Sequence, residues 1–275
     1  GARSAAHLKG AQATSNEGAG QRSSPQPRSG FGIGSQATPL NGDGAEEPVP
    51  VDERREIERF YRERLRRFGA RDARCLGFTR DSQRKRFEAL CDLGDLDRRR
   101  LLDVGCGLGD LLPFLLERGV RPFYSGLDLC GEMISRCRTK FRSRPDVACH
   151  FEVGSVLKHE PAGPYDFVVS SGMFGCSTPR ARERIGPSLE RMFSWCTEGM
   201  AVNFLSAKAS RREGEFLYVD PAEAIKLALR LTPVVRMRHD YLPNDFTLYL
   251  YRNGARHASR ARRRSEPRMN GLEVG

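Results

Sequence analysis

Residues 101–110 read Leu101-Leu102-Asp103-Val104-Gly105-Cys106-Gly107-Leu108-Gly109-Asp110. An apolar run leads into three glycines at alternating positions, and an apolar helical pattern resumes at Leu111. This order predicts a buried strand, a turn and a helix. Glycines in such a turn let the backbone approach a ligand closely and adopt a positive φ. Because ligands of parallel sheets bind at the carboxyl ends of the strands, the stretch predicts a binding site.

Two carboxylates narrow the class of ligand. Asp103 stands two residues before Gly105, where a negative charge suits a cationic amino-acid group and does not suit a pyrophosphate. Asp128 ends the next predicted strand, where an acid can accept both hydroxyls of a ribose. The ribose contact alone would also fit a nicotinamide dehydrogenase. Asp103 instead favours S-adenosylmethionine (SAM), whose amino-acid part is cationic.

The stretch from Asp103 to Gly109 resembles the glycine-rich first motif of class I SAM-dependent methyltransferases, and Asp128 matches the ribose-binding acid of that family. The resemblance covers roughly residues 98–252. It implies an α/β fold with a doubly wound, seven-stranded, mostly parallel sheet. The last strand would be antiparallel, and helices would cover both faces. The segments Leu76-Gly77-Phe78 and Arg238-His239-Asp240-Tyr241 are similar to a bacterial group of these enzymes whose substrate is unknown.

The resemblance implies S-adenosyl-L-methionine as cofactor and also implies its contacts. The expected cofactor-binding residues are Asp103, Gly105, Cys106, Gly107, Asp128, Leu129, Ser155, Val156 and Ser170. Many relatives carry an acid after the third strand, but here Gly154-Ser155-Val156 stands at that place. The Ser155 hydroxyl or the Val156 backbone is therefore expected to meet the adenine. No metal site is expected.

Transfer to an oxygen nucleophile usually needs a base. The candidates near the predicted sheet edge are His239, Asp240 and Tyr241, with Asp110 as a further one. His239 has a plain alternative as a partly buried, hydrogen-bonded side chain, and Asp110 has one as an acid in the first turn of a helix. Residues 170–174 should line the transfer site. They lack the Asn/Asp-Pro-Pro-aromatic pattern of enzymes that methylate nucleobase amines, which disfavours those acceptors.

Apolar periodicity predicts the remaining elements. The expected strands are 100–104, 123–129, 149–153, 165–170, 200–205, 234–238 and 246–251. The first expected helix begins at Val51 and ends before Gly69. Further helices are expected over residues 81–93, 111–117, 132–141, 184–196 and 221–231.

Composition divides the chain into four expected segments. Residues 1–48 are rich in Gly, Ser, Ala, Gln and Pro and predict a disordered tail, because they cannot bury enough apolar surface. Residues 49–97 predict a helical arm that acts as a lid, and Arg74 and Phe78 are expected to contact cofactor or substrate. Residues 98–253 predict the SAM-binding methyltransferase domain. Residues 254–275 predict a basic disordered tail.

The formal net charge of +11 bears on the methyl acceptor. Residues 51–100 contribute +5 and residues 254–275 contribute +4, so the predicted catalytic domain is nearly neutral. This favours a small-molecule acceptor with an O or N nucleophile. Two alternatives remain open: an RNA- or protein-modifying enzyme that uses the basic segments, and a SAM-binding protein without catalysis. The sequence leaves the oligomeric state unknown.

Eight cysteines occur without any C-x-x-C spacing, which predicts buried free thiols rather than disulfides or zinc ligands. The sequence shows no apolar run of membrane-spanning length and no secretory signal. A cytoplasmic protein without a membrane partner is therefore expected.

Overall fold

Strands β1 (Arg100–Val104) and β4 (Tyr165–Ser171) are neighbours at the centre of the sheet, where the strand order reverses. The computed structural model describes residues 51–252, so the predicted tails 1–48 and 254–275 lie outside the described residues. The other elements are α1 (Val51–Phe68), the 3-10 helix η1 (Ala73–Leu76), α2 (Arg80–Cys91), α3 (Leu111–Glu117), β2 (Phe123–Asp128), α4 (Gly131–Phe141), β3 (Cys149–Val153), α5 (Ile185–Trp195), β5 (Cys196–Ser206), β6 (Tyr218–Val219), α6 (Pro221–Leu231), β7 (Val235–Arg238) and β8 (Asp245–Tyr251).

The sheet follows the order β3-β2-β1-β4-β5-β8-β7, and the short β6 pairs with β5 beside this path. Strands β3, β2, β1, β4 and β5 pair in parallel. Strand β8 runs antiparallel to both of its neighbours, β5 and β7. The predicted doubly wound, mostly parallel sheet with an antiparallel last strand is confirmed. Strand β6 is an addition that the sequence did not indicate.

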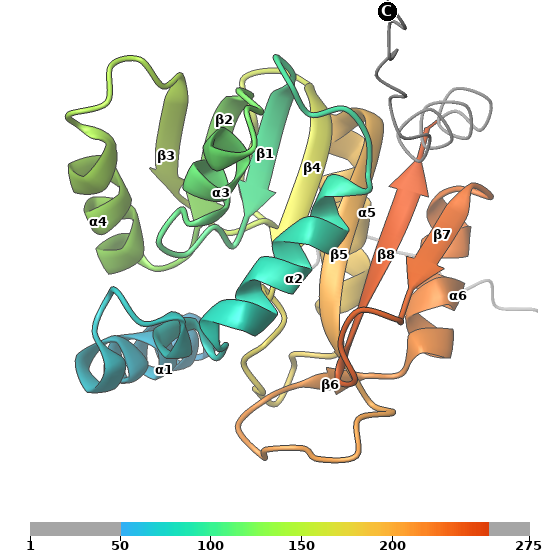
Figure 1. The fold of residues 1–275 in the computed structure, drawn as a ribbon. Helices are drawn as coiled ribbons and strands as arrows, with labels where there is room; N and C mark the ends of the chain where they lie inside the picture. Colours follow the sequence, from blue (N-terminus) through green and yellow to red (C-terminus); the bar gives the residue numbers. More distant parts are fainter. Residues whose placement is uncertain (1–50, 253–275) are drawn as a thin grey trace, which may run out of the picture. The chain divides into compact units, whose positions relative to one another are not determined.

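Helices cover both faces of the sheet (Figure 1). Alternate residues of each strand enter separate hydrophobic cores, because successive side chains of a strand point to opposite faces. Leu101 packs with the residues of α2, α3 and α4. Its neighbour Leu102 packs with those of α5 and α6. The sheet therefore separates two cores, and the carboxyl ends of its central strands lie between the helical layers.

Local signals set most helix and strand ends. Helix α6 begins as predicted, with Pro221 in its first turn and the Asp220 side chain accepting a 2.8 Å hydrogen bond from the Ala222 amide. Strand β5 is longer than predicted, because it begins at Cys196 directly after α5. Thr197, Glu198 and Gly199 gave no apolar alternation. In the fold Gly199 pairs with Phe167 and Tyr251, whereas Thr197 and Glu198 lie where the register between β4 and β5 shifts.

All eight cysteines are free thiols, and six of them are buried, as predicted. Over residues 51–252, no helix combines the length and the apolar content that crossing a bilayer requires.

Candidate active site

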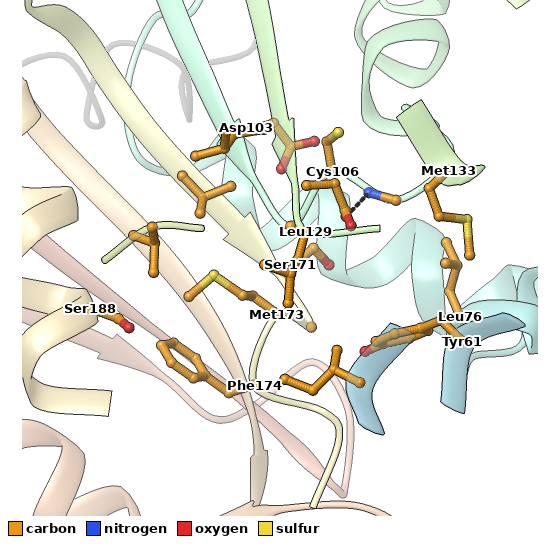
Figure 2. A pocket seen from close by; sticks show the side chains of 18 of the residues that line it. Tyr61, Leu76, Asp103, Cys106, Leu129, Met133, Ser171, Met173, Phe174 and Ser188 are labelled. Carbon is orange, nitrogen blue, oxygen red and sulfur yellow. Dashed lines mark hydrogen bonds between the residues drawn. The ribbon is translucent and has the colours of Figure 1, made fainter. Parts of the chain in front are cut away.

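A pocket opens at the carboxyl ends of β1, β2 and β4, where the strand order reverses. Its lining brings together residues from the glycine-rich turn, from the ends of three strands and from the arm. Figure 2 shows Tyr61 and Leu76 of the arm on one side of the pocket and Phe174 and Ser188 on the other. The arm therefore forms one wall of the pocket.

The glycine-rich turn has the conformation that its residues predict. Gly105 and Gly107 have φ values of 71° and 54°, in the left-handed region. A Cβ atom at Gly105 would lie 2.8 Å from the Cβ atom of Met173. The backbone there lies so close to the opposite wall that only glycine fits. The amides of Gly105 and Cys106 both donate to the carbonyl oxygen of Leu127, at 2.7 Å and 3.2 Å, which fixes the turn against β2.

Asp128 holds this turn in place. One carboxylate oxygen accepts a 2.8 Å hydrogen bond from the amide of Gly107, and the other accepts one of 2.8 Å from the amide of Cys130. Burial raises the pKa of Asp128, and the two amide hydrogen bonds oppose that rise. Each carboxylate oxygen has a second lone pair. The carboxylate lines the pocket and can still accept a pair of hydroxyls.

Asp103 lies deeper, with only 3% of its surface exposed. The Tyr124 hydroxyl donates a 2.6 Å hydrogen bond to its Oδ2 atom. Burial raises the pKa of Asp103 to about 7, although the Tyr124 hydrogen bond lowers it. No cationic side chain pairs with Asp103 among the described residues. A buried carboxyl group without a cationic partner at a pocket wall fits a ligand that brings the cation itself.

Most of the other residues expected at the cofactor line the pocket: Cys106, Leu129, Ser155 and Val156 do so. Ser170 does not. It is fully buried, and its neighbour Ser171 lines the pocket instead. Adjacent strand residues point to opposite faces, so a prediction that is wrong by one position selects the wrong face.

The residues expected to supply a base lie away from the pocket lining. The His239 ring packs edge-on against Phe246, and Asp240 accepts hydrogen bonds from the exposed guanidinium of Arg238. The Tyr241 hydroxyl contacts Thr247 and Asn203. All three follow β7, at the edge of the sheet, whereas the pocket lies at its centre. The structure does not bring the predicted trio to the pocket.

Asp110 does line the pocket, but its carboxylate pairs with Lys140 at 2.7 Å. Of the two arm residues expected at the ligand, Phe78 lines the pocket. Arg74 instead pairs with Asp72 at 2.6 Å and lies off the lining.

Several lining residues were missed as site residues, among them Ile57, Tyr61, Leu76, Met133, Arg184 and Ser188. Ile57 and Tyr61 follow the spacing of the apolar stripe of an amphipathic helix, and they do belong to that helix, so their spacing gave no sign of a binding site. Burial raises the pKa of Tyr61, so its hydroxyl stays protonated at neutral pH. Within residues 51–252, no group of three or more His, Cys, Asp or Glu side chains could hold a metal ion.

An ion pair joins the arm to a residue of the pocket lining. Glu53 of α1 lies 3.1 Å from Arg184, which precedes α5. Thr178 donates a hydrogen bond to Glu53 and accepts one from Arg184. This network fastens the arm to the opposite wall.

Comparison with known proteins identifies a domain. Residues 101–199 match the family model described as a methyltransferase domain. The chain therefore carries a methyltransferase domain over these residues. The matched segment runs from β1 to the start of β5, so it contains the central strands β1 and β4 and the glycine-rich turn.

Two curated relatives agree with this family. A candidate methyltransferase of Mycobacterium tuberculosis is 28% identical over 153 residues, which span 53% of this chain and 89% of that protein. The malonyl-[acyl-carrier protein] O-methyltransferase of Acetivibrio thermocellus is 34% identical over 96 residues, which span 34% of this chain and 32% of that protein.

Solved structures share the fold of the methyltransferase. The magnesium protoporphyrin IX methyltransferase of Synechocystis, solved with S-adenosylhomocysteine (SAH) bound, aligns with a TM-score of 0.55 at 15% identity. The alignment covers 73% of this chain and 99% of that one. A methyltransferase of Streptomyces caelestis aligns with a TM-score of 0.50 at 14% identity, over 62% of this chain and 89% of that one.

SAM is the methyl donor of the family, and the pocket passes a physical test for it. The pocket presents the carboxyl group of Asp103, which has no cationic side-chain partner among the described residues, and the carboxylate of Asp128, whose oxygens keep free lone pairs. SAM has an ammonium group, a sulfonium and a ribose, so its chemistry fits these two carboxyl groups.

Proposed function

We propose that this methyltransferase transfers the methyl group of SAM to an oxygen or nitrogen nucleophile of a small, largely apolar molecule. The observation that carries the proposal is the Asp128 carboxylate. It is fixed by two backbone amides, and it lies in the same pocket as the uncompensated carboxyl group of Asp103.

Each expected cofactor residue except Ser170 takes a role in this proposal. Asp128 accepts the ribose hydroxyls, and Asp103 attracts the ammonium group. The backbone from Gly105 to Gly107 lies along the amino-acid part. Leu129, Ser155 and Val156 surround the adenine, and Cys106 contributes packing, since a hydrogen bond with Cys137 together with burial keeps the pKa of its thiol well above the ordinary value.

The acceptor side of the pocket supports a small apolar substrate. Phe78, Met173 and Phe174 give this part of the lining an apolar character, and Ser171 and Ser188 add hydroxyls. The sulfonium of SAM supplies an already activated methyl group, so the protein mainly has to orient the acceptor and exclude water. The described part of the lining contains neither histidine nor lysine. Catalysis by positioning fits this lining better than catalysis by a strong base.

Calorimetry tests the cofactor assignment, with SAM, SAH and NAD titrated into the full chain. SAM and SAH should bind, and NAD should not. Turnover is tested with labelled SAM and the small-molecule fraction of a cell extract, followed by mass spectrometry of the labelled product. Binding of NAD without SAM would overturn the proposal. Binding of SAM without any turnover would favour a non-catalytic SAM-binding protein.

A second candidate function rests on a separate cleft. Arg71, Arg80 and Arg136 are exposed and line a cleft that shares Gln83 and Asp110 with the cofactor pocket. Such a basic surface beside the active site would suit an acidic acceptor such as RNA. Substrate binding that weakens steeply with added salt would favour this alternative. Binding that is indifferent to salt supports the small-molecule acceptor.

A further inference from the structure

Three polar residues form a row across the sheet beside the pocket. Ser171 of β4 pairs in register with Asn203 of β5, and Asn203 pairs in register with Thr247 of β8. Residues in register share a face of the sheet. Each residue of the row has a neighbour two positions away on its own strand, and these neighbours are Val169, Ala201 and Tyr249. The three neighbours pack into the core beneath α2, so the row faces α2 as well. Ser171 also lines the cofactor pocket.

The row has hydrogen-bonding capacity that the fold leaves unused. The buried Oγ atom of Ser171 and the buried Oδ1 atom of Asn203 have no hydrogen-bond partner among the described residues. The Asn203 amide nitrogen, in contrast, donates to Thr247 and, at 3.1 Å, to Tyr241. An unpaired buried polar atom destabilises the fold, and this row contains two. Apolar side chains at these positions would avoid that cost.

Arg86 of α2 adds a third unused group. Its Nε and Nη2 atoms hold the two carboxylate oxygens of Asp245 at 2.6 Å and 2.9 Å, and both side chains are buried. The Nη1 atom of Arg86 has no partner in the described residues. Because Asp245 neutralises the guanidinium, the site carries hydrogen-bond donors without a net charge.

Phe78 lines the cofactor pocket and also lies beside Arg86. Its ring lies over Gly172, where a Cβ atom would stand 2.4 Å from the Phe78 Cζ atom. The Arg86 guanidinium carbon lies 3.7 Å from the centre of the same ring. Phe78 follows Gly77, which has a left-handed φ of 86°, so the ring lies at a turn between η1 and α2. A turn of the ring would join the row to the pocket.

We infer that this row and Arg86 receive the hydrogen-bonding group of the methyl acceptor, and this inference rests on the proposed function. That group has to accept from Ser171 or Arg86 and donate to Asn203. A hydroxyl or a primary amide does both. A carboxylate would repel the Asn203 oxygen and Asp245, and an ammonium group would face the Arg86 guanidinium. The acceptor is therefore a largely apolar molecule that carries a hydroxyl or an amide.

Three small probes test this inference: phenol, benzamide and toluene. Each is titrated into protein saturated with SAH, and ligand-observed NMR gives the dissociation constants. Phenol and benzamide should bind at least threefold more tightly than toluene. Asn203→Ala should weaken phenol binding about three- to tenfold, the effect of one lost hydrogen bond, and should leave SAH affinity unchanged. Ser171→Ala is the second variant, with the same expected loss of phenol binding.

Ser206→Ala is the matched control. It removes a buried hydroxyl from the same strand as Asn203, on the opposite face, and should leave phenol binding unchanged. Equal affinity for toluene and phenol would overturn the inference, as would equal effects of Asn203→Ala and Ser206→Ala. Failure of SAH to bind would overturn the proposed function itself. SAH binding without discrimination among the probes would overturn only the assignment of the acceptor group.

Discussion

The Tyr124 hydroxyl donates a 2.6 Å hydrogen bond to Oδ2 of Asp103, and the two side chains are buried together behind the glycine-rich turn. This pair joins β2 to β1 below the pocket. It also sets the charge of Asp103, because burial raises the pKa of this carboxyl group to about 7 and the Tyr124 hydrogen bond lowers it.

SAM affinity should therefore depend on pH. Above about pH 7 Asp103 is ionised and attracts the ammonium group, and as the pH falls through about 7 it is protonated and the attraction is lost. Tyr124→Phe removes the hydrogen bond that lowers the pKa, so the midpoint should move to higher pH. Calorimetry between pH 6 and 9 measures both curves. A Tyr124→Phe curve that coincides with the wild type would show that Asp103 does not control the affinity.

Asp103 should also make the stability of the unliganded protein depend on pH, in the opposite direction to the SAM affinity. The pKa of Asp103 is higher in the folded chain than the ordinary value of 3.8, so its contribution to stability is fully present below that value and is lost as the pH rises through about 7. Asp103→Asn removes this titration. The melting temperature of the wild type relative to Asp103→Asn should fall as the pH rises from 4 to 8. A difference that stays constant over this range would contradict the assignment.

Asp128→Ala should weaken SAM binding by about 1–3 kcal/mol, because the ribose hydroxyls lose charge-assisted hydrogen bonds. The change should also lower the melting temperature, because the amides of Gly107 and Cys130 lose their acceptors. Asp128→Asn is the control, since it keeps the shape of the side chain and one acceptor oxygen. It should weaken SAM binding by less than Asp128→Ala does. Wild-type affinity in Asp128→Ala, measured by calorimetry, would exclude Asp128 from the ribose contact.

Two glycines allow conformational strain to be separated from steric clash. Gly172 has a φ of 82° and no room for a Cβ atom beside Phe78, whereas Gly69 has a φ of 75° and nothing within 4 Å. Gly69→Ala should lower the free energy of unfolding by about 1 kcal/mol, because alanine has to adopt the left-handed backbone. Gly172→Ala should lower it by more, since the Phe78 ring must also move. Urea unfolding measures both, and equal costs would show that Phe78 yields freely.

Deletion of residues 254–275 should leave methyl transfer to a small acceptor unchanged. The last described strand ends at Tyr251, and the described residues that line the pocket all precede the deletion. Turnover of the full chain and of a chain that ends at Asn253 is compared at low and high salt. A loss of turnover that appears only at low salt would favour an RNA acceptor held by the arginines of this segment.

The sequence predicted the parts of this protein that depend on local pattern. Strand β1 and helix α6 have the predicted bounds, because an apolar run before glycine and an Asp-Pro helix start are local signals. The start of β5 at Cys196 was missed, because Thr197, Glu198 and Gly199 show no apolar alternation and the register between β4 and β5 shifts there. The roles proposed for Asp103 and Asp128 stay predictions, but both carboxylates line one pocket.

The acceptor side could not be predicted in the same way. His239 and Asp240 carry the right chemistry, but the strand order puts them at an edge that no local pattern reveals. Conversely, Tyr61 belongs to a helix far from the glycine-rich turn in sequence, and only packing places its ring in the pocket. The row of Ser171, Asn203 and Thr247 depends on the register of three strands, and a register shift of one residue would disperse it.

The ion pair between Glu53 and Arg184 has a consequence for the pace of catalysis. Arg184 lines the pocket and Glu53 belongs to α1, so a movement of α1 away from the pocket separates the pair. We expect each exchange of SAH for SAM to use this movement, so that the pair has to separate and form again. We expect departure of SAH, rather than methyl transfer, to limit the turnover rate. The purified enzyme should accordingly retain bound SAH. The Glu53→Gln variant should be purified without bound SAH and should have a higher turnover rate.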